Sequence, residues 1–352
     1  MVIQNVVAGG VFAVVLLVLG APVHSGSGDP AYKISDPLFA SDAPLAITLT
    51  APLSQAKRER DKSAVYPAEI RHQEKAFAVD LTLRGNKRLK KKVCSYPPLR
   101  VEFDKNAVTQ SIFEHQRDLK LVVQCKDGNL YADYLRAEYL IYQALNMLTP
   151  LSFEARWVDM TFIDTDGQMK DRFEGAFFVE HKGRLAKRNR RDVADMPGIK
   201  ITELDLSAAA VLDLFQFIVA NPDYSFTTAP PGDECCHNAK LLSGPNSGSY
   251  TPLIYDFDSS GAINAKYAAP AANLGIRKVT QRYYMGYCEA NAVLNEARTR
   301  VLASREQVLE LFDADPLLSQ RMKTRLGKFM SDGFDILSDD GSFTKYVVNR
   351  CR

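Results

Sequence analysis

Residues 207–223 read SAAAVLDLFQFIVANPD, an apolar run that leads directly into a polar turn. Ser207 can cap a helix that continues to Ala220 and is apolar nearly all round. The Asn-Pro pair that follows ends this helix, because the residue before a proline disfavours helical conformation. We therefore predict a buried central helix that delivers Asp223 to the mouth of a loop, where a catalytic base or an Asx-turn residue would lie.

Two later motifs carry further oxygen ligands in a fixed order. Asn238 follows a Cys-Cys-His run, and a side-chain amide oxygen is a hard, neutral ligand suited to Mg²⁺. Asp256 and Asp258 end the apolar strand Leu253–Tyr255, where alternation puts both carboxylates on one face. Two like charges repel there unless a cation shares them. The alternatives are a turn-capping asparagine and a solvated acidic turn.

A lysine and a glutamate interrupt otherwise apolar segments. Lys120 lies in the apolar strand 119–123, and Glu138 lies in the apolar stripe of a helix predicted over 131–148. A buried carboxylate is costly unless a cation meets it. We therefore expect the two side chains to form an ion pair, the alternative being a lysine that reaches the surface and a glutamate at the helix edge.

A basic turn follows another predicted strand. Arg84 and Gly85 close the strand 79–83 and precede the run KRLKKK at 87–92. A glycine lets backbone N–H groups approach an anion, and the cations favour phosphate. The segment is thus a phosphate-binding turn or a basic hairpin on the surface.

The order of the elements changes along the chain, from mainly strands to mainly helices. After strands near 46–50 and 78–83, the alternation predicts a hairpin formed by 157–163 and 173–180. Helices are expected near 289–313 and 315–337.

Composition and the first residues limit the class of protein. The chain is 46% hydrophobic and 24% charged, as in an ordinary soluble globular protein, and its formal net charge of +2 argues against bulk nucleic-acid binding. Residues 1–25 contain no Lys, Arg, Asp or Glu and include a short apolar run. We expect a signal peptide at 1–25 that is cleaved on export, the alternative being a membrane anchor formed by residues 5–23.

Export makes the six cysteines candidates for disulfides. The adjacent pair, Cys235 and Cys236, would be strained if bonded to each other, so we expect each to bond elsewhere. A zinc site at the Cys-Cys-His run is less favoured, because three consecutive residues rarely converge on one tetrahedral ion.

Taken in order, these segments resemble the CotH family of spore-coat-type kinases, within the wider group of atypical protein-kinase-like folds that includes HipA-like enzymes. The resemblance covers about residues 80–260, roughly half of the chain. It rests on short stretches: Leu83-Arg84-Gly85-Asn86 with the basic run, Leu99–Phe103, Leu119-Lys120-Leu121, the helix Tyr134–Leu148, Gly175–Glu180, Asn221-Pro222-Asp223, His237-Asn238 and Tyr255–Asp258.

The resemblance implies a nucleotide site. Lys120 would bind the nucleotide phosphates, and Glu138 would hold Lys120 in place. Arg84 and Gly85 would belong to the phosphate-binding turn, and Glu180 would lie at the hinge between two lobes.

The resemblance also implies a catalytic and metal site. Asp223 would be the catalytic aspartate, Asn238 and Asp256 would be metal ligands, and Asp258 would assist them. The chain departs from the family pattern at Pro222, where a small or aromatic residue is usual, and in the loop that follows, which carries two cysteines.

We therefore expect an α+β protein with a bilobal protein-kinase-like fold: a sheet-rich N-terminal lobe at 26–180 and a helical C-terminal lobe at 181–352. The expected function is a secreted or periplasmic phosphotransferase that uses ATP with Mg²⁺ or Mn²⁺ and acts on a protein hydroxyl. The rival functions are a catalytically inactive, secreted pseudokinase-like binding module and a hydrolase that releases phosphate. The sequence leaves the acceptor, the disulfide pairing and the oligomeric state open.

Overall fold

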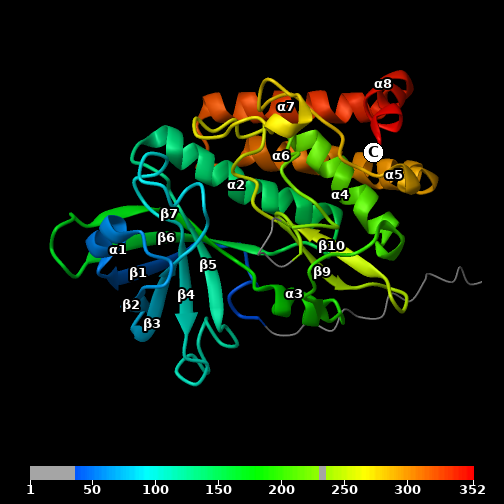
Figure 1. Cartoon of the computed structure of the whole chain (residues 1–352). Helices are drawn as coiled ribbons and strands as arrows, with labels where there is room; N and C mark the ends of the chain where they lie inside the picture. The colour runs from blue at the N-terminus through cyan, green and yellow to red at the C-terminus, as the bar shows by residue number, and fades with distance from the viewer. Residues whose placement is uncertain (1–35, 230–234) are drawn as a thin grey trace, which may run out of the picture. The chain divides into compact units, whose positions relative to one another are not determined.

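Seven strands form a closed barrel in the first half of the chain (Figure 1). The structure is a computed structural model, and it describes residues 36–229 and 235–352. Neighbouring strands in the barrel follow the order β1-β2-β3-β4-β5-β7-β6. Their bounds are β1 (Leu45–Ala51), β2 (Val65–His72), β3 (Lys75–Leu83), β4 (Leu99–Phe103), β5 (Asp118–Val123), β6 (Ala155–Asp164) and β7 (Arg172–Val179).

The first strand closes the barrel. Strand β1 pairs in parallel with β6, from Leu45 opposite Val158 to Ala51 opposite Asp164. The other neighbouring pairs are antiparallel. Apolar side chains fill the barrel at alternate strand positions, as the predicted strands near 46–50, 78–83 and 119–123 require.

The bilobal protein-kinase-like fold that we expected is wrong, because the strands of the sheet-rich region form a closed barrel. The strands expected near 46–50, 78–83 and 119–123 are confirmed by β1, β3 and β5, and the hairpin near 157–180 is confirmed by β6 and β7, whereas β2 was not predicted. Alternation, however, shows which face of a strand is buried and not which strand lies beside it. The parallel pairing of β1 with β6 joins segments that are distant in sequence, and no local pattern predicts it.

Helix α2 (Asn129–Leu148) lies between β5 and β6 in sequence and packs against the barrel strands β6 and β7. It ends at Leu148, and the C-cap residue Thr149 precedes a proline that cannot continue the helix. Its ring contacts join Tyr139 to Trp157 at 5.4 Å and Tyr142 to Phe177 at 5.8 Å. The helix thereby fixes the side chains of its other face, including Glu138, relative to the barrel.

A small sheet and a group of helices follow the barrel. Strand β9 (Ala239–Ser243) pairs with both β8 (Val193–Ala194) and β10 (Tyr250–Ile254). The helix predicted near 289–313 is interrupted at Ser304, and the one near 315–337 begins at Gln320. The helices are α1 (Leu53–Glu59), α3 (Lys182–Arg188), α4 (Leu206–Val219), α5 (Leu294–Ala303), α6 (Arg305–Ala314), α7 (Gln320–Ser338) and α8 (Asp340–Tyr346).

Helix α4 is the buried central helix that the sequence predicts, although Asp205 and not Ser207 caps it, by accepting from the N–H of Ala208. Its one acidic residue, Asp213, is buried among apolar side chains. The Tyr224 hydroxyl donates to one carboxylate oxygen of Asp213, and the other oxygen has no hydrogen-bond partner among the described residues. Burial raises the pKa of Asp213 to about 7.

The buried carboxylate predicts a pH-dependent stability. The folded pKa lies above the unfolded value of 3.8, so the folded state holds the proton and the unfolded state does not between these values. Stability should therefore fall as pH rises from about 4 to 7 and then level off. Asp213→Asn should remove this slope and raise the free energy of unfolding above pH 7 by up to about 4 kcal/mol. Urea unfolding of both proteins from pH 4 to 9 measures it, and an unchanged slope in the variant would contradict the assignment.

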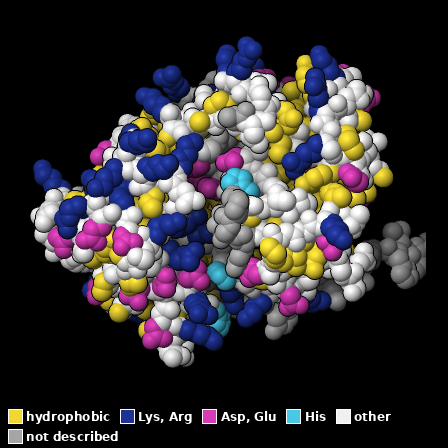
Figure 2. All heavy atoms as spheres, viewed as in Figure 1, with side chains coloured by type: hydrophobic (Ala, Val, Ile, Leu, Met, Phe, Trp, Pro, Cys, Tyr) yellow, Lys and Arg dark blue, Asp and Glu magenta, His cyan; other side chains and the backbone are white. Residues whose placement is uncertain are grey.

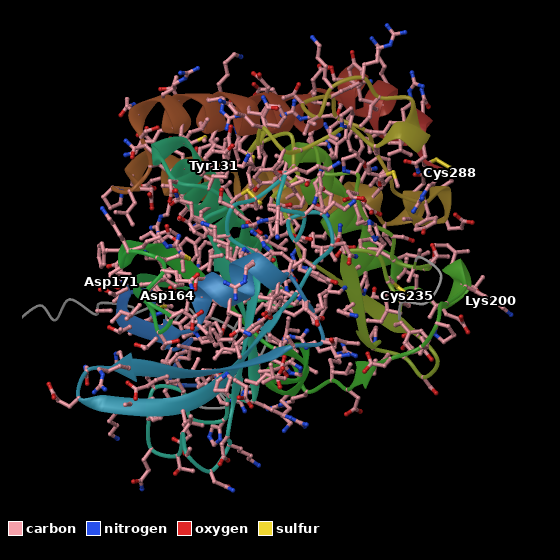
Figure 3. All side chains as sticks on the ribbon, turned by 60° about the vertical axis from the view of Figure 1, so that its left-hand side comes forward. Tyr131, Asp164, Asp171, Lys200, Cys235 and Cys288 are labelled. Atoms are coloured by element: carbon pink, nitrogen blue, oxygen red, sulfur yellow. A yellow bond between two sulfur atoms is a disulfide. The ribbon has the colours of Figure 1, made fainter. Side chains whose placement is uncertain are left out.

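All six cysteines are paired, which indicates an oxidising environment. Cys94 bonds to Cys125, and Cys288 bonds to Cys351. The expectation for the adjacent pair was wrong, because Cys235 bonds to Cys236 (Figure 3). Cys235 and Cys236 are both buried, and the other four cysteines of the described chain are paired with one another.

The predicted signal peptide at 1–25 and its alternative, an anchor formed by residues 5–23, lie outside the described residues. Within residues 36–229 and 235–352, no helix combines the length and apolar character that crossing a bilayer requires.

The Cys94–Cys125 disulfide should stabilise the barrel measurably. It closes a segment with a sequence separation of 31, so replacing both cysteines by alanine should lower the free energy of unfolding by about 3–4 kcal/mol. Chemical denaturation of the two proteins measures the loss. Peptide mapping of the non-reduced wild type should recover this link, and a Cys94 peptide joined to any other cysteine would contradict the pairing.

Candidate functional site

The hairpin of β9 and β10 brings two of the predicted motifs together. Ala239 lies opposite Ile254 in the register, so the residues just outside the hairpin, Asn238 and Tyr255, are also neighbours. The N–H of Tyr255 donates to the Asn238 carbonyl at 3.2 Å. The third motif joins them through Asn221, whose side-chain amide donates to the Asp256 carbonyl at 3.5 Å.

Asp223 lies exposed after α4 and is held by two side chains. One carboxylate oxygen lies 2.8 Å from Nε2 of His237. Nδ2 of Asn238 donates to the backbone carbonyl of Asp223 at 2.7 Å and to its other carboxylate oxygen at 3.3 Å. The hydrogen bond from His237 is the largest of the effects that hold the pKa of Asp223 below its usual value, and Lys87 adds to it. The carboxylate is therefore ionised and oriented at neutral pH.

Two residues of this site have left-handed backbone conformations. The φ angles are 48° at Asn238 and 71° at Asp256. Such angles are uncommon outside glycine and carry a local free-energy cost, which asparagine and aspartate tolerate best. Asn238 lies just before β9 begins and Asp256 lies just after β10 ends, so strand alternation does not set the direction of the Asp256 and Asp258 side chains as expected.

Two carboxylates lie beside one largely buried arginine, and a third, Asp256, interacts electrostatically with the same group. Arg88 Nη1 lies 3.8 Å from Glu138 and 3.6 Å from Asp258. Burial first, and then the charge of Asp258, raise the pKa of Glu138 well above its usual value, against the pull of Arg88. Burial first, and then the charge of Asp256, raise the pKa of Asp258 to about 6. The acidic cluster, defined as Glu138, Asp256 and Asp258, therefore brings three carboxylates near one arginine, and burial and mutual repulsion favour the protonated forms of Glu138 and Asp258.

Lys120 does not meet Glu138 within ion-pair distance, contrary to the predicted pair. Its ammonium lies 3.7 Å from the ring centre of Tyr255, above the face of the ring. Burial lowers the pKa of Lys120 well below its usual value, and the cations Arg84, Lys240 and Arg100 lower it further. We call these four residues the cationic cluster, and Asp256 is the carboxylate that opposes it.

The basic turn connects the barrel to Asp223. Gly85 has a φ of 76°, which glycine adopts without strain. Next to it, Lys87 lines a pocket of about 170 Å³ together with Asn221, Asp223 and Ser259. Figure 2 shows a group of Lys and Arg side chains beside the central hollow, with Asp, Glu and His side chains near its upper edge.

Glu180 forms an ion pair with Arg188, a residue of neither the acidic nor the cationic cluster. Its carboxylate accepts from Nε of Arg188 at 2.9 Å and from the N–H of Glu154 at 3.1 Å. Burial raises its pKa to about 7, while Arg188 opposes the shift. This carboxylate ties α3 to the start of β6, so the expected hinge residue has a structural ion-pair role here.

The predicted metal ligands lie in one region without forming a closed ligand set. Within the described part of the chain, no group of three or more His, Cys, Asp or Glu side chains is arranged to hold a metal ion. The amide nitrogen of Asn238 faces Asp223. Asp256 and Asp258 thus remain as two carboxylates that could share a cation with a ligand's oxygens. The Cys235–Cys236 disulfide removes the thiolates that a zinc site would use.

Sequence reasoning missed Arg88 as the partner of Glu138. It belongs to the basic run at 87–92, where nothing distinguishes an arginine that turns inward from its solvated neighbours. The role of His237 beside Asp223 was also missed, although its position next to Asn238 was a signal. Searches with protein-family models and among curated proteins found no match for this chain.

The excess of carboxylates predicts unequal effects of two substitutions. Arg88→Met should leave Glu138 and Asp258 buried without a cation and lower the free energy of unfolding by about 3 kcal/mol or more. Glu138→Gln keeps the shape and removes repulsion, so it should be neutral or stabilising. Urea unfolding at pH 7.5 without divalent cations compares the two variants.

At pH 5 the Arg88→Met loss should shrink, because the carboxylates then take up protons. Equal losses for Arg88→Met and Glu138→Gln at pH 7.5 would show that the charges are balanced and would contradict the account of the acidic cluster.

Proposed function

We propose that this protein is a phosphotransferase that moves the γ-phosphoryl group of ATP to a protein hydroxyl with the help of Mg²⁺ or Mn²⁺. One observation carries the proposal: the cationic cluster around Lys120 and the acidic cluster around Arg88 adjoin at Asp256, which interacts with both Lys120 and Glu138. A metal-bound polyphosphate complements both clusters. Its anionic oxygens suit the cationic cluster, and its divalent cation suits the carboxylates of the acidic cluster.

The donor set fits a hard divalent cation. Mg²⁺ is commonly bound through one or two carboxylates together with phosphate oxygens and water, and Asp256 and Asp258 provide two carboxylates. A bound cation would also relieve the repulsion that raises the pKa values of Glu138 and Asp258. The ion would neutralise the negative charge that develops on the transferred phosphoryl group.

The remaining residues have roles that follow from their positions. Lys120 and Arg84 would bind phosphate oxygens, and the Gly85 turn lets the backbone approach them. Asp223 would orient the acceptor hydroxyl and accept its proton. As the acceptor oxygen bonds to the γ-phosphorus, the bond from that phosphorus to the bridging oxygen breaks, and ADP leaves.

The resemblance of the ordered motifs to the CotH family supports the same chemistry. The proposal does not depend on a shared fold, because related chemistry occurs on unrelated folds and resides in the side chains of a site. The paired cysteines are compatible with a secreted or periplasmic protein, and we propose that localisation over anchoring by residues 5–23.

A nucleotide-binding module without turnover is the second candidate. Both carboxylate oxygens of Asp223 already accept contacts, from His237 and Asn238. An acceptor hydroxyl would have to share or displace these contacts, so the same geometry could serve binding alone.

Two substitutions separate binding from transfer. Asp256→Asn should abolish metal-dependent ATP binding, because the carboxylate shared by both clusters is lost. Asp223→Asn should retain ATP binding and reduce transfer by a factor of about 10² or more, as for a positioned base. Calorimetry measures binding, and radiolabelled ATP with a mixture of protein acceptors and the protein itself measures transfer, in Mg²⁺ and in Mn²⁺.

Asp171→Asn is the matched control, because Asp171 is an exposed aspartate that precedes β7 and is remote in sequence from both clusters. Wild-type protein that binds ATP but labels no acceptor would favour the binding module. Wild-type protein that binds no nucleotide would contradict both candidates.

A further inference from the structure

Four exposed lysines lie within six residues of one another on the loop that follows β3. They are Lys87, Lys90, Lys91 and Lys92, which we call the lysine ridge. Among residues 36–229 and 235–352, no carboxylate lies within ion-pair distance of these four ammonium groups, although many other surface cations have acidic partners. The ridge therefore concentrates positive charge on a chain whose formal net charge is only +2.

The loop that carries the ridge is held in place. The Arg60 guanidinium donates to the carbonyl oxygens of Leu89 at 3.1 Å, Cys94 at 3.1 Å and Ser95 at 2.5 Å. The disulfide between Cys94 and Cys125 connects the end of the loop to the segment that follows β5. The four lysine ammonium groups repel one another, but the hydrogen bonds from Arg60 and the disulfide hold the backbone of the loop in place. A preorganised charged surface binds a partner with less loss of conformational entropy than a free tail does.

The first lysine of the ridge belongs to the candidate active site. Lys87 lines the same pocket as Asp223, and its charge lowers the pKa of both Asp223 and Asp258. Beside it, Arg88 turns inward to the acidic cluster. The three following lysines are exposed and lie within five residues of Lys87 along the loop.

We propose that the lysine ridge binds acidic side chains that flank the acceptor hydroxyl, so that the preferred acceptor is an acidic segment of a polypeptide. The proposal rests on the phosphotransferase function for its place in the reaction. The binding step itself needs only the ridge and an acidic peptide, and it can be measured without turnover.

A polypeptide fits the ridge better than a nucleic acid does. An extended peptide advances about 3.3 Å per residue, so acidic residues within a few positions of the hydroxyl would reach lysines within a few positions of Lys87. Nucleic-acid binding domains are usually strongly basic as a whole, whereas the cations here gather on one loop of a nearly neutral chain.

The test uses one charge-reversal variant and a matched control. In the ridge variant, Lys90, Lys91 and Lys92 are each replaced by glutamate, and Lys87 is left intact because it lines the catalytic pocket. In the control, the exposed residues Lys75, Lys105 and Lys345 are replaced by glutamate, which changes the net charge equally. Lys75 begins β3, at the end opposite the ridge.

The probes are a fluorescent peptide with one serine flanked by glutamates and the same peptide with glutamines. Fluorescence anisotropy in about 0.15 M salt gives Kd for each protein. Wild type and control should bind the acidic peptide about tenfold more tightly than the ridge variant does, and the glutamine peptide should bind all three weakly. Added salt should weaken the wild-type complex.

Equal affinity of wild type and ridge variant for the acidic peptide would overturn the proposal. So would a duplex oligonucleotide that wild type prefers to the acidic peptide at the same salt. ATP binding by calorimetry, measured in parallel, should be the same for all three proteins. Ridge-dependent peptide binding without any transfer would refute the phosphotransferase function and leave the docking surface standing.

Discussion

The charge imbalance around Arg88 is the constraint on which the rest of the site depends. Arg88 comes from the loop after β3, Glu138 from α2, and Asp258 from the segment after β10. The three side chains can meet only if the barrel, α2 and the hairpin pack as they do. A buried arginine between two carboxylates contributes little net stability by itself, but loss of the cation is costly because the carboxylates cannot reach water. The site thus keeps three carboxylates beside the cationic cluster, and two of them lie near the same arginine.

This arrangement relates the fold to the proposed chemistry. Arg84, Arg100 and Lys120 come from or directly follow the neighbouring strands β3, β4 and β5, where Arg100 lies opposite both Thr82 and Lys120. Helix α4 and the β9–β10 hairpin lead to Asp223 and Asp256 in the helical part of the chain. Tyr142 joins the two, since its ring packs on Phe257 at 4.9 Å and its hydroxyl accepts from the N–H of Asp256 at 3.0 Å. The backbone of Asp256 is therefore fixed to α2, which limits how far the two clusters can move apart.

Local patterns in the sequence predicted β1, β3, β5, β6, β7, α2 and α4, because hydrophobic periodicity reports which face of an element is buried, but they did not predict β2. They did not predict the barrel, since the pairing of β1 with β6 depends on contacts between distant segments. The same limit applied to the site. The positions of Asp223 and Asp256 beside Asn238 followed from the order of the motifs, whereas the partner of Glu138 did not. Lys120 and Arg88 are both cations near apolar residues in the sequence. Only the structure shows that Lys120 lies over the Tyr255 ring and that Arg88 lies beside Glu138.

The central claim is that the acidic cluster is completed by a divalent cation brought with a polyphosphate. Calorimetric titration of ATP with Mg²⁺ near pH 6, in buffers of different ionisation enthalpy, tests it most directly. The cation should lower the pKa of Asp258, which is about 6 in its absence, and of Glu138, so binding should release protons into the buffer. The account predicts that ATP binding depends on the metal and releases protons at pH 6. At pH 8.5 Asp258 is already ionised, so its share of the proton release should disappear. Binding that needs no metal, or that leaves the proton count unchanged at pH 6, would contradict it.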